Sequence, residues 1–164
     1  MKWGRAVRRR FRNLSDPVLI IPCSGIGKTF GSISREATYC VVEDLKKEET
    51  DTLCLSLLVM GDEDAIRSVK SHICITIDGC PNECSKKNLQ FLDAKIAANY
   101  RVVDILRENR NLKPTAITFL DEDGRKLARI LAENITSKID ELNNWSTVSA
   151  INHLRLGWSP VAVN

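Results

Sequence analysis

The sequence predicts an α/β fold: a single three-layer domain built on an open, mostly parallel sheet of the Rossmann or flavodoxin-like type. Short apolar runs of strand length alternate with longer segments in which apolar residues recur at helical spacing. The chain has 164 residues, 43% of them hydrophobic and 27% charged, which suits one domain with its own core. Elements that alternate in this way place helices on both faces of a parallel sheet.

Three strands are expected in the first half of the chain. PVLIIP, residues 17–22, is wholly apolar, as in a strand buried on both faces. DTLCL, residues 51–55, follows the polar connection KKEET, and ICITID, residues 73–78, is the third strand. The second strand either ends near Leu55 or continues towards Met60, and the sequence leaves both possibilities open.

Helices are expected between these strands and after the third. The first follows the glycine-rich turn CSGIGKTFGS and covers residues 33–45, where apolar residues recur at helical spacing. The second covers residues 61–72 and has acidic residues at its start, which suits the positive end of the helix dipole. The third starts near Pro81, and its apolar face reaches Ile96.

The second half of the chain is expected to hold two more strands and a last helix. NYRVVDIL, residues 99–106, and TAITFL, residues 115–120, are apolar runs of strand length. DEDGRK then turns into an amphipathic helix. The inward face of this helix is expected to consist of Leu127, Ile130, Leu131, Ile135, Ile139 and Leu142.

Positive charge is concentrated at the start of the chain. Residues 1–16 carry six Lys or Arg against Asp16, a balance of +5 in a chain of net charge +3, so the remainder is near −2. We interpret residues 1–16 as a solvated basic arm, and we expect no nucleic-acid binding because the body lacks a basic and aromatic face. The α/β domain is expected over residues 17–144. Residues 145–164 form a tail, in which two tryptophans either dock on the body or stay free: Trp145 and Trp158.

The sequence indicates neither a membrane span nor a secretion signal. Its longest apolar runs, PVLIIPC and LCLSLLVM, are far shorter than the roughly 20 residues that a transmembrane helix needs. The basic start has no long apolar stretch and no small-residue cleavage site. We therefore expect a cytoplasmic protein with reduced thiols, in which six cysteines favour metal binding or catalysis over disulfides.

Four of the six cysteines are expected at one edge of the sheet. Cys23 ends the first strand, and Cys80 follows the third. Cys84 lies one helical turn beyond Cys80, so both thiols can face one point. Cys54 joins this edge if the second strand ends early. In an open parallel sheet, ligands bind at the carboxyl ends of the strands.

The remaining cysteines and both histidines are expected elsewhere. Cys74 and His72 lie at the opposite end of the third strand, roughly 15 Å or more from its carboxyl end. Cys40 falls on the apolar face of the first helix, and a free cysteine often behaves as a small buried hydrophobe. His153 lies in the tail.

The donor set predicted to bind a metal is therefore Cys23, Cys54, Cys80 and Cys84. Zinc takes four such thiolates tetrahedrally, and an iron–sulfur cluster uses the same ligands, so spacing alone leaves both open. Four thiolates around a divalent ion need compensation of their negative charge. Candidates for hydrogen bonds to the thiolates are the backbone near Ser24, Gly25 and Gly79, and Asp78 is either an outer acceptor or a turn residue.

Other chemistries compete for the same residues. A Walker A loop needs glycine where Pro22 stands, and proline cannot adopt the required backbone angles. The C-x₅-R loop of low-molecular-weight phosphatases and arsenate reductases would make Cys23 the nucleophile, but Thr29 occupies the arginine position. Cys80 and Cys84 could also form a C-x₃-C redox pair. A thiol-based redox enzyme or a cysteine-nucleophile enzyme therefore remains the alternative to a metal-binding protein.

The motifs PCSGIG, TLCL and above all IDGCPNEC resemble those of the DGC-domain family of proposed zinc-binding proteins. The family is named for the triplet found here as Asp78-Gly79-Cys80, and the resemblance covers roughly Pro17 to Leu142. The protein partner stays unknown, and the resemblance does not define a reaction. It does imply four metal-coordinating cysteines, which fall on Cys23, Cys54, Cys80 and Cys84.

Overall fold

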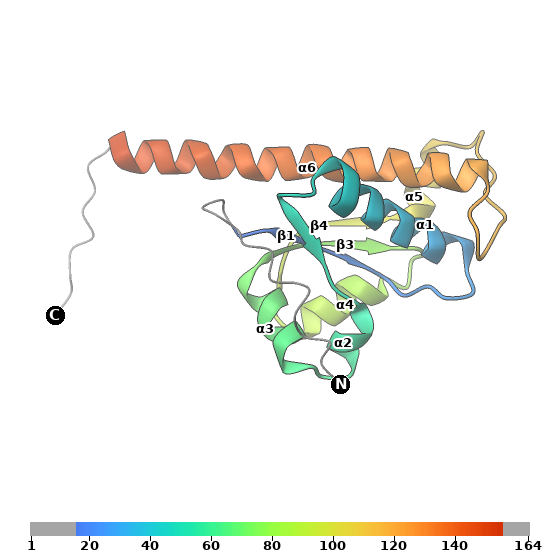
Figure 1. The fold of residues 1–164 in the computed structure, drawn as a ribbon, viewed down its shortest axis with the longest axis horizontal. Coiled ribbons are helices and arrows are strands. Elements are labelled where there is room, and N and C mark those ends of the chain that lie inside the picture. Colours follow the sequence, from blue (N-terminus) through green and yellow to red (C-terminus); the bar gives the residue numbers. More distant parts are fainter. Residues whose placement is uncertain (1–15, 156–164) are drawn as a thin grey trace.

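Four parallel strands form the sheet in the part of the chain that the computed structural model describes, which is residues 16–155, with side chains for residues 16–144 (Figure 1). Their order across the sheet is β2-β1-β3-β4. This arrangement confirms the predicted α/β class with an open parallel sheet. The strands are β1 (Val18–Pro22), β2 (Thr50–Thr52), β3 (Ile73–Asp78) and β4 (Lys95–Arg101).

Helices cover both faces of this sheet (Figure 1). One face carries α1 (Thr29–Tyr39), its π-helical continuation η1 (Cys40–Leu45), α5 (Val102–Glu108) and α6 (Glu122–Arg155). The other face carries α2 (Leu55–Val59), α3 (Glu63–Ser71) and α4 (Cys84–Phe91). Within residues 16–155, no helix combines the length and the apolar character needed to cross a bilayer.

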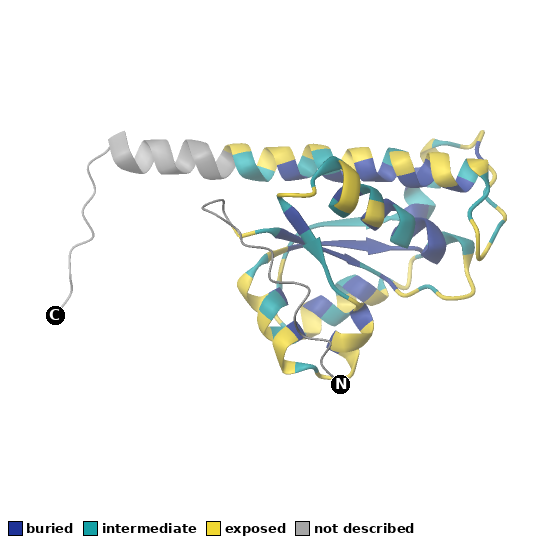
Figure 2. Ribbon diagram, viewed as in Figure 1, coloured by how far each residue is buried: buried dark blue, intermediate teal, exposed yellow. Residues whose placement is uncertain are grey.

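Alternating side chains on the central strand fill two separate cores. Val18 and Ile20 pack against α1, α5 and α6, whereas Leu19 and Ile21 pack against α2, α3 and α4. Figure 2 shows the central strands β1 and β3 as largely buried between these two sets of helices. Because both faces are covered, the strand must be apolar throughout, and each fully buried aliphatic side chain contributes about 1.5–3 kcal/mol.

The strand register brings the carboxyl ends of β1, β2 and β3 to one edge. Ile20 pairs with Thr52 of β2, and Pro22 pairs with Ile77 of β3. The residues that follow each strand therefore lie side by side along this edge, where the candidate site is located.

The expected strand at residues 115–120 is wrong. This segment is irregular, and Phe119 is 87% exposed. The N–H groups of Thr115 and Ala116 donate to the Oδ2 atom of Asp121, at 2.8 and 3.2 Å, and not to a neighbouring strand. The Ser32 hydroxyl on α1 donates to the carbonyl of residue 117, which ties the segment to that helix.

Two further boundaries differ from the sequence prediction. The helix expected to reach Ile96 ends at Phe91, and Asp93, with φ +55°, turns the chain into β4. The strand expected over residues 99–106 therefore starts earlier and ends at Arg101, and the rest of that run is α5. Ile96 and Tyr100 are four residues apart yet contact different cores, because the register of β4 on β3 shifts between Ile96 and Ala98.

Several sequence predictions concern residues outside the described part. Residues 1–15 of the basic arm and Trp158 lie there, as do the side chains of Trp145 and His153. The backbone of α6 continues across the expected boundary between residues 144 and 145, up to Arg155.

The start of α6 is held by one carboxylate, which leads to a pH-dependent prediction. Asp121 accepts hydrogen bonds from the Gly124 and Thr115 N–H groups, each at 2.8 Å. These and further bonds lower the pKa of Asp121 to about 2, from an ordinary value of 3.8. A lowered folded-state pKa stabilises the protein fully above the ordinary value, and this contribution is lost as the pH falls towards the folded-state value.

We expect the Asp121→Ala variant to have a lower urea midpoint than the wild type at pH 5, because it lacks the cap. The difference should shrink between pH 3.8 and about pH 2, as the wild-type carboxylate is protonated. Glu108→Ala is the control, since Glu108 is exposed and makes no hydrogen bond or ion pair with a described residue. A constant difference between Asp121→Ala and the wild type across this pH range would contradict the assignment.

Candidate functional site

The four cysteines predicted as ligands follow the carboxyl ends of three neighbouring strands. Because β2 ends at Thr52, the alternative in which it continued towards Met60 and displaced its cysteine is excluded. One cysteine follows β1 directly, one precedes α2, one follows β3 and one begins α4; these are Cys23, Cys54, Cys80 and Cys84. The positions that sequence reasoning selected therefore share one edge of the sheet.

Cys23 follows β1, the middle of the three strands, and is the most buried of the four cysteines. It is 8% exposed, and its Sγ atom accepts the Gly79 N–H at 3.2 Å and lies 3.6 Å from the Ser34 hydroxyl. Burial raises the pKa of the Cys23 thiol, although the hydrogen bonds from Ser34 and Gly79 oppose this shift. The negative charge of Asp78 also raises that pKa.

Asp78 fixes the position of α4 against the end of β3. Its carboxylate is 1% exposed and accepts the N–H groups of Ser85 and Lys86, at 2.8 and 3.2 Å. The Ser85 hydroxyl in turn donates to the carbonyl of Ile21 in β1 at 2.8 Å. Burial raises the pKa of Asp78, and the two N–H donors lower it. Asp78 thus acts as the cap of α4 and places Cys84 beside the strand ends.

The expectation that Cys84 lies one helical turn beyond Cys80 is wrong, because α4 starts at Cys84. Residues 80–83 form a turn, and Glu83, with φ +51°, directly precedes the first helical residue. Lys86, two residues after Cys84, forms an ion pair with Glu83 at 3.1 Å. Cys80 and Cys84 therefore approach the edge from a turn and from a helix.

The loop after β1 packs directly against α1. Gly25, with φ +47°, and Gly31 are so close that a Cβ atom on Gly31 would lie 2.2 Å from the Gly25 carbonyl oxygen. Ser24 is exposed, and its carbonyl accepts a hydrogen bond from Arg35. Of the backbone groups considered as donors to sulfur, the described hydrogen bond to Cys23 comes from Gly79.

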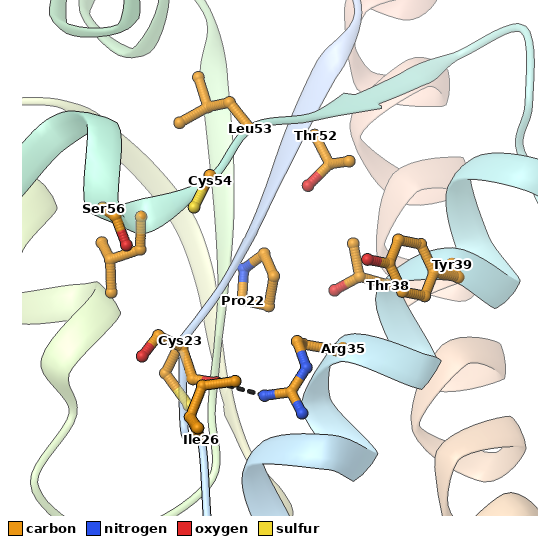
Figure 3. Close-up of a pocket in the computed structure, with 12 residues that line it drawn as sticks. Pro22, Cys23, Ile26, Arg35, Thr38, Tyr39, Thr52, Leu53, Cys54 and Ser56 are labelled. Carbon is orange, nitrogen blue, oxygen red and sulfur yellow. Dashed lines mark hydrogen bonds between the residues drawn. The ribbon is translucent and has the colours of Figure 1, made fainter. Parts of the chain in front are cut away.

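Two of the cysteines, Cys23 and Cys54, line a pocket of about 380 Å³ (Figure 3). The pocket lies between the ends of β1 and β2, the start of α2 and one face of α1. Arg35 and Tyr39 of α1 also line it, and sequence reasoning missed both. Nothing in the sequence around them signals this role, because they reach the pocket only through the packing of α1 on the sheet.

The other residues considered as ligands lie elsewhere. Cys74 is fully buried in the second core at the start of β3, and Cys40 packs at the margin of the first core. The Nδ1 atom of His72 hydrogen-bonds the Ser68 carbonyl at the end of α3, at 2.8 Å. These positions agree with the expected separation from the carboxyl edge.

The thiols differ in their expected reactivity. Hydrogen bonds from Ser56, and then from the Leu57 backbone, lower the pKa of the exposed Cys54 thiol. Burial raises the pKa of Cys74 to about 11. With chelator-treated protein at pH 8, we expect iodoacetamide to alkylate Cys54 on the order of tenfold faster than Cys74, or more, as followed by peptide mass spectrometry. Equal rates in the folded protein would contradict these environments, and equal rates after urea denaturation are the control.

The donor chemistry of this edge suits zinc, because four thiols gather there and one already accepts a backbone N–H. Among residues 16–144, however, no three Cys, His, Asp or Glu side chains converge closely enough to hold a metal ion. The structure thus brings the four thiols to one edge without arranging them around a common point.

Comparison with known proteins gives one family. The family model described as the DGC domain matches residues 19–136, which include all four of these cysteines. No curated protein and no solved structure matches the chain significantly.

Proposed function

Because this chain belongs to the DGC-domain family, we propose that it is a metal-binding protein that holds zinc through four thiolates. The proposed ligands are Cys23, Cys54, Cys80 and Cys84. The observation that carries the proposal is their common location: each follows the carboxyl end of one of three adjacent parallel strands. The N–H···S contact from Gly79 to Cys23 supports it, since such contacts stabilise metal thiolates.

A zinc ion bound by these residues would serve a structural role. The ligands come from separate connections after β1, β2 and β3, so one ion would join three segments that are far apart in the sequence. Structural zinc contributes about 10–16 kcal/mol near neutral pH, compared with about 2–4 kcal/mol for a disulfide. In the absence of a defined reaction, the proposal is a structural or regulatory metal site in a cytoplasmic protein.

The competing thiol chemistries have weaker support. A cysteine nucleophile needs a lowered thiol pKa, whereas burial raises the pKa of Cys23. Cys80 and Cys84 are both free thiols, and no hydrogen bond joins them among the described residues. Thr29, at the arginine position of the phosphatase loop, donates its hydroxyl to the Thr115 carbonyl at 3.3 Å.

The test is metal analysis with an absorption spectrum on protein purified without oxygen. We expect about one zinc per chain and a colourless solution, whereas a brown solution would indicate an iron–sulfur cluster. Cys80→Ser and Cys84→Ser should each release the metal. Cys74→Ser is the matched control and should retain it, because Cys74 lies buried in the second core.

Retention of stoichiometric metal by both the Cys80→Ser and the Cys84→Ser protein would exclude the proposed site. The same preparations should be assayed for ATP hydrolysis and phosphatase turnover. Clear activity of metal-free protein in either assay would favour an enzyme over a metal-binding protein.

A further inference from the structure

The pocket beside Cys23 and Cys54 contains a cationic side chain whose charge is not neutralised by a described carboxylate. The Arg35 guanidinium extends from α1 towards the segment that carries Cys23 (Figure 3). It donates to the carbonyl of Ser24 and, at 3.0 Å, to the hydroxyl of Ser32. A guanidinium has five N–H groups, so three stay available. Within residues 16–144, the ion pairs leave Arg35 without an acidic partner.

A second donor comes from the next turn of the same helix. Tyr39 lines the pocket, and its hydroxyl is directed into it (Figure 3). No described residue hydrogen-bonds this hydroxyl, and Tyr39 is 50% exposed. A half-exposed tyrosine with a free hydroxyl, four residues after an arginine, lies on the same side of the helix as that arginine. The two side chains therefore offer a charged and a neutral donor from one wall.

The remaining walls are mainly apolar. Pro22 and Leu53 come from the ends of two strands, Leu55 from the start of α2, and Ile26 from the loop after β1. At about 380 Å³, the pocket falls within the range of roughly 300–1,000 Å³ that is typical of small-molecule sites. In a site of this kind, the few polar groups fix the orientation of the ligand, and the apolar walls contact the rest of its surface.

We propose that this pocket binds a small monocarboxylate with a short aliphatic body. Its carboxylate would contact Arg35 and the Tyr39 hydroxyl, and its body would lie over Pro22, Leu53 and Leu55. A single guanidinium balances one negative charge, and planar two-point recognition of a carboxylate is the geometry that arginine favours. A phosphate dianion fits less well, because Arg35 is the sole lysine or arginine among the residues that line the pocket. The inference goes beyond metal binding and does not require a metal.

The experiment is a titration of the isotope-labelled full chain by ¹H–¹⁵N NMR, with the Arg35 Nε–H and the backbone amides of α1 as reporters. The probes are sodium pentanoate, its neutral isostere pentanamide, and inorganic phosphate. We expect saturable shifts with pentanoate that are confined to the pocket. Pentanamide and phosphate should each bind at least about tenfold more weakly than pentanoate. Pentanamide lacks the charge-assisted hydrogen bonds to arginine, and phosphate matches them poorly.

Arg35→Gln should weaken pentanoate binding by about tenfold or more, and Tyr39→Phe by about threefold or more. Tyr39→Phe removes one hydroxyl with no described hydrogen bond, so it keeps the test valid should Arg35→Gln disturb the loop through Ser24. Arg125→Gln is the matched control. Arg125 lines the neighbouring hollow that Arg35 and Tyr39 also border, but not this pocket, so its loss should leave the affinity unchanged.

Three results would overturn the inference: no saturable shift with pentanoate, equal affinity for pentanoate and pentanamide, or loss of binding in Arg125→Gln but not in Arg35→Gln. Tighter binding of phosphate than of pentanoate would also overturn it. Metal content, measured on the same samples, separates this outcome from that of the zinc proposal.

Discussion

Replacing Gly31 with alanine is expected to destabilise the protein by about 3 kcal/mol or more, because the added atom would overlap backbone rather than a movable side chain. A Cβ atom at this position would lie 2.2 Å from the Gly25 carbonyl oxygen and 2.4 Å from the Gly25 Cα atom. The loop after β1 or the start of α1 would have to move. For a chain of this size, we expect a fall in melting temperature of roughly 6–12 °C, measured by circular dichroism.

Gly27→Ala provides the matched control for this prediction. Gly27 lies in the same loop with φ +80°, but a Cβ atom there would meet nothing within 4 Å. Its substitution adds only the strain of a left-handed backbone, on the order of 1 kcal/mol. If the two variants lost the same stability, the close approach of the loop to α1 would not be the cause. Movement of the loop in Gly31→Ala should also displace Cys23. We therefore expect a lower metal content in Gly31→Ala than in Gly27→Ala.

Asp78→Ala is expected to cost roughly 2–5 kcal/mol, because it leaves two N–H groups at the start of α4 without their acceptor. In the wild type, the N–H groups of Ser85 and Lys86 donate to the carboxylate of Asp78, which is 1% exposed. The buried charge is itself unfavourable, as the raised pKa of Asp78 indicates, so part of the loss is offset. We expect a lower urea midpoint and faster hydrogen exchange in the first turn of α4.

Asp78→Asn and Asp62→Ala complete this experiment. The asparagine keeps one acceptor oxygen and should recover part of the stability. Asp62 caps α3 through one hydrogen bond to the Ala65 N–H at 2.9 Å, and its loss should cost about 1 kcal/mol, as for an ordinary cap. Should Asp78→Ala cost no more than Asp62→Ala, the carboxylate would not hold α4 in place. Because Cys84 begins α4, we also expect Asp78→Ala to bind zinc more weakly than Asp62→Ala.

Much of the fold could be predicted from the sequence, because its central strands are encoded locally. PVLIIP and ICITID are apolar on both faces, and a strand of this kind suits only a sheet covered on both sides. Their ends then fix which cysteines share an edge. The location of Cys23 and Cys80 required only this topology, whereas that of Cys54 depended on where β2 ends.

The elements that were predicted wrongly are set by individual side-chain acceptors and not by the apolar pattern of the segment itself. The run at residues 115–120 has strand-like composition, but the carboxylate of Asp121 takes its N–H groups. The start of α4 is set by Asp78, seven residues before the first N–H that it accepts. The pocket could not be predicted at all. Arg35 reaches it because α1 packs beside the end of β1, and no local pattern reports that contact.

The short strand β2 gives the cysteine edge one side that can open on its own. It has three residues and lies at the margin of the sheet, where β1 is its single partner. Local opening at sheet margins requires far less free energy than global unfolding. Detachment of Thr50–Thr52 would carry Cys54 away while Cys23 and the β3–α4 corner stay in place. Exchange of a metal or of a pocket ligand would then proceed through this flank, at a rate set by fraying of β2.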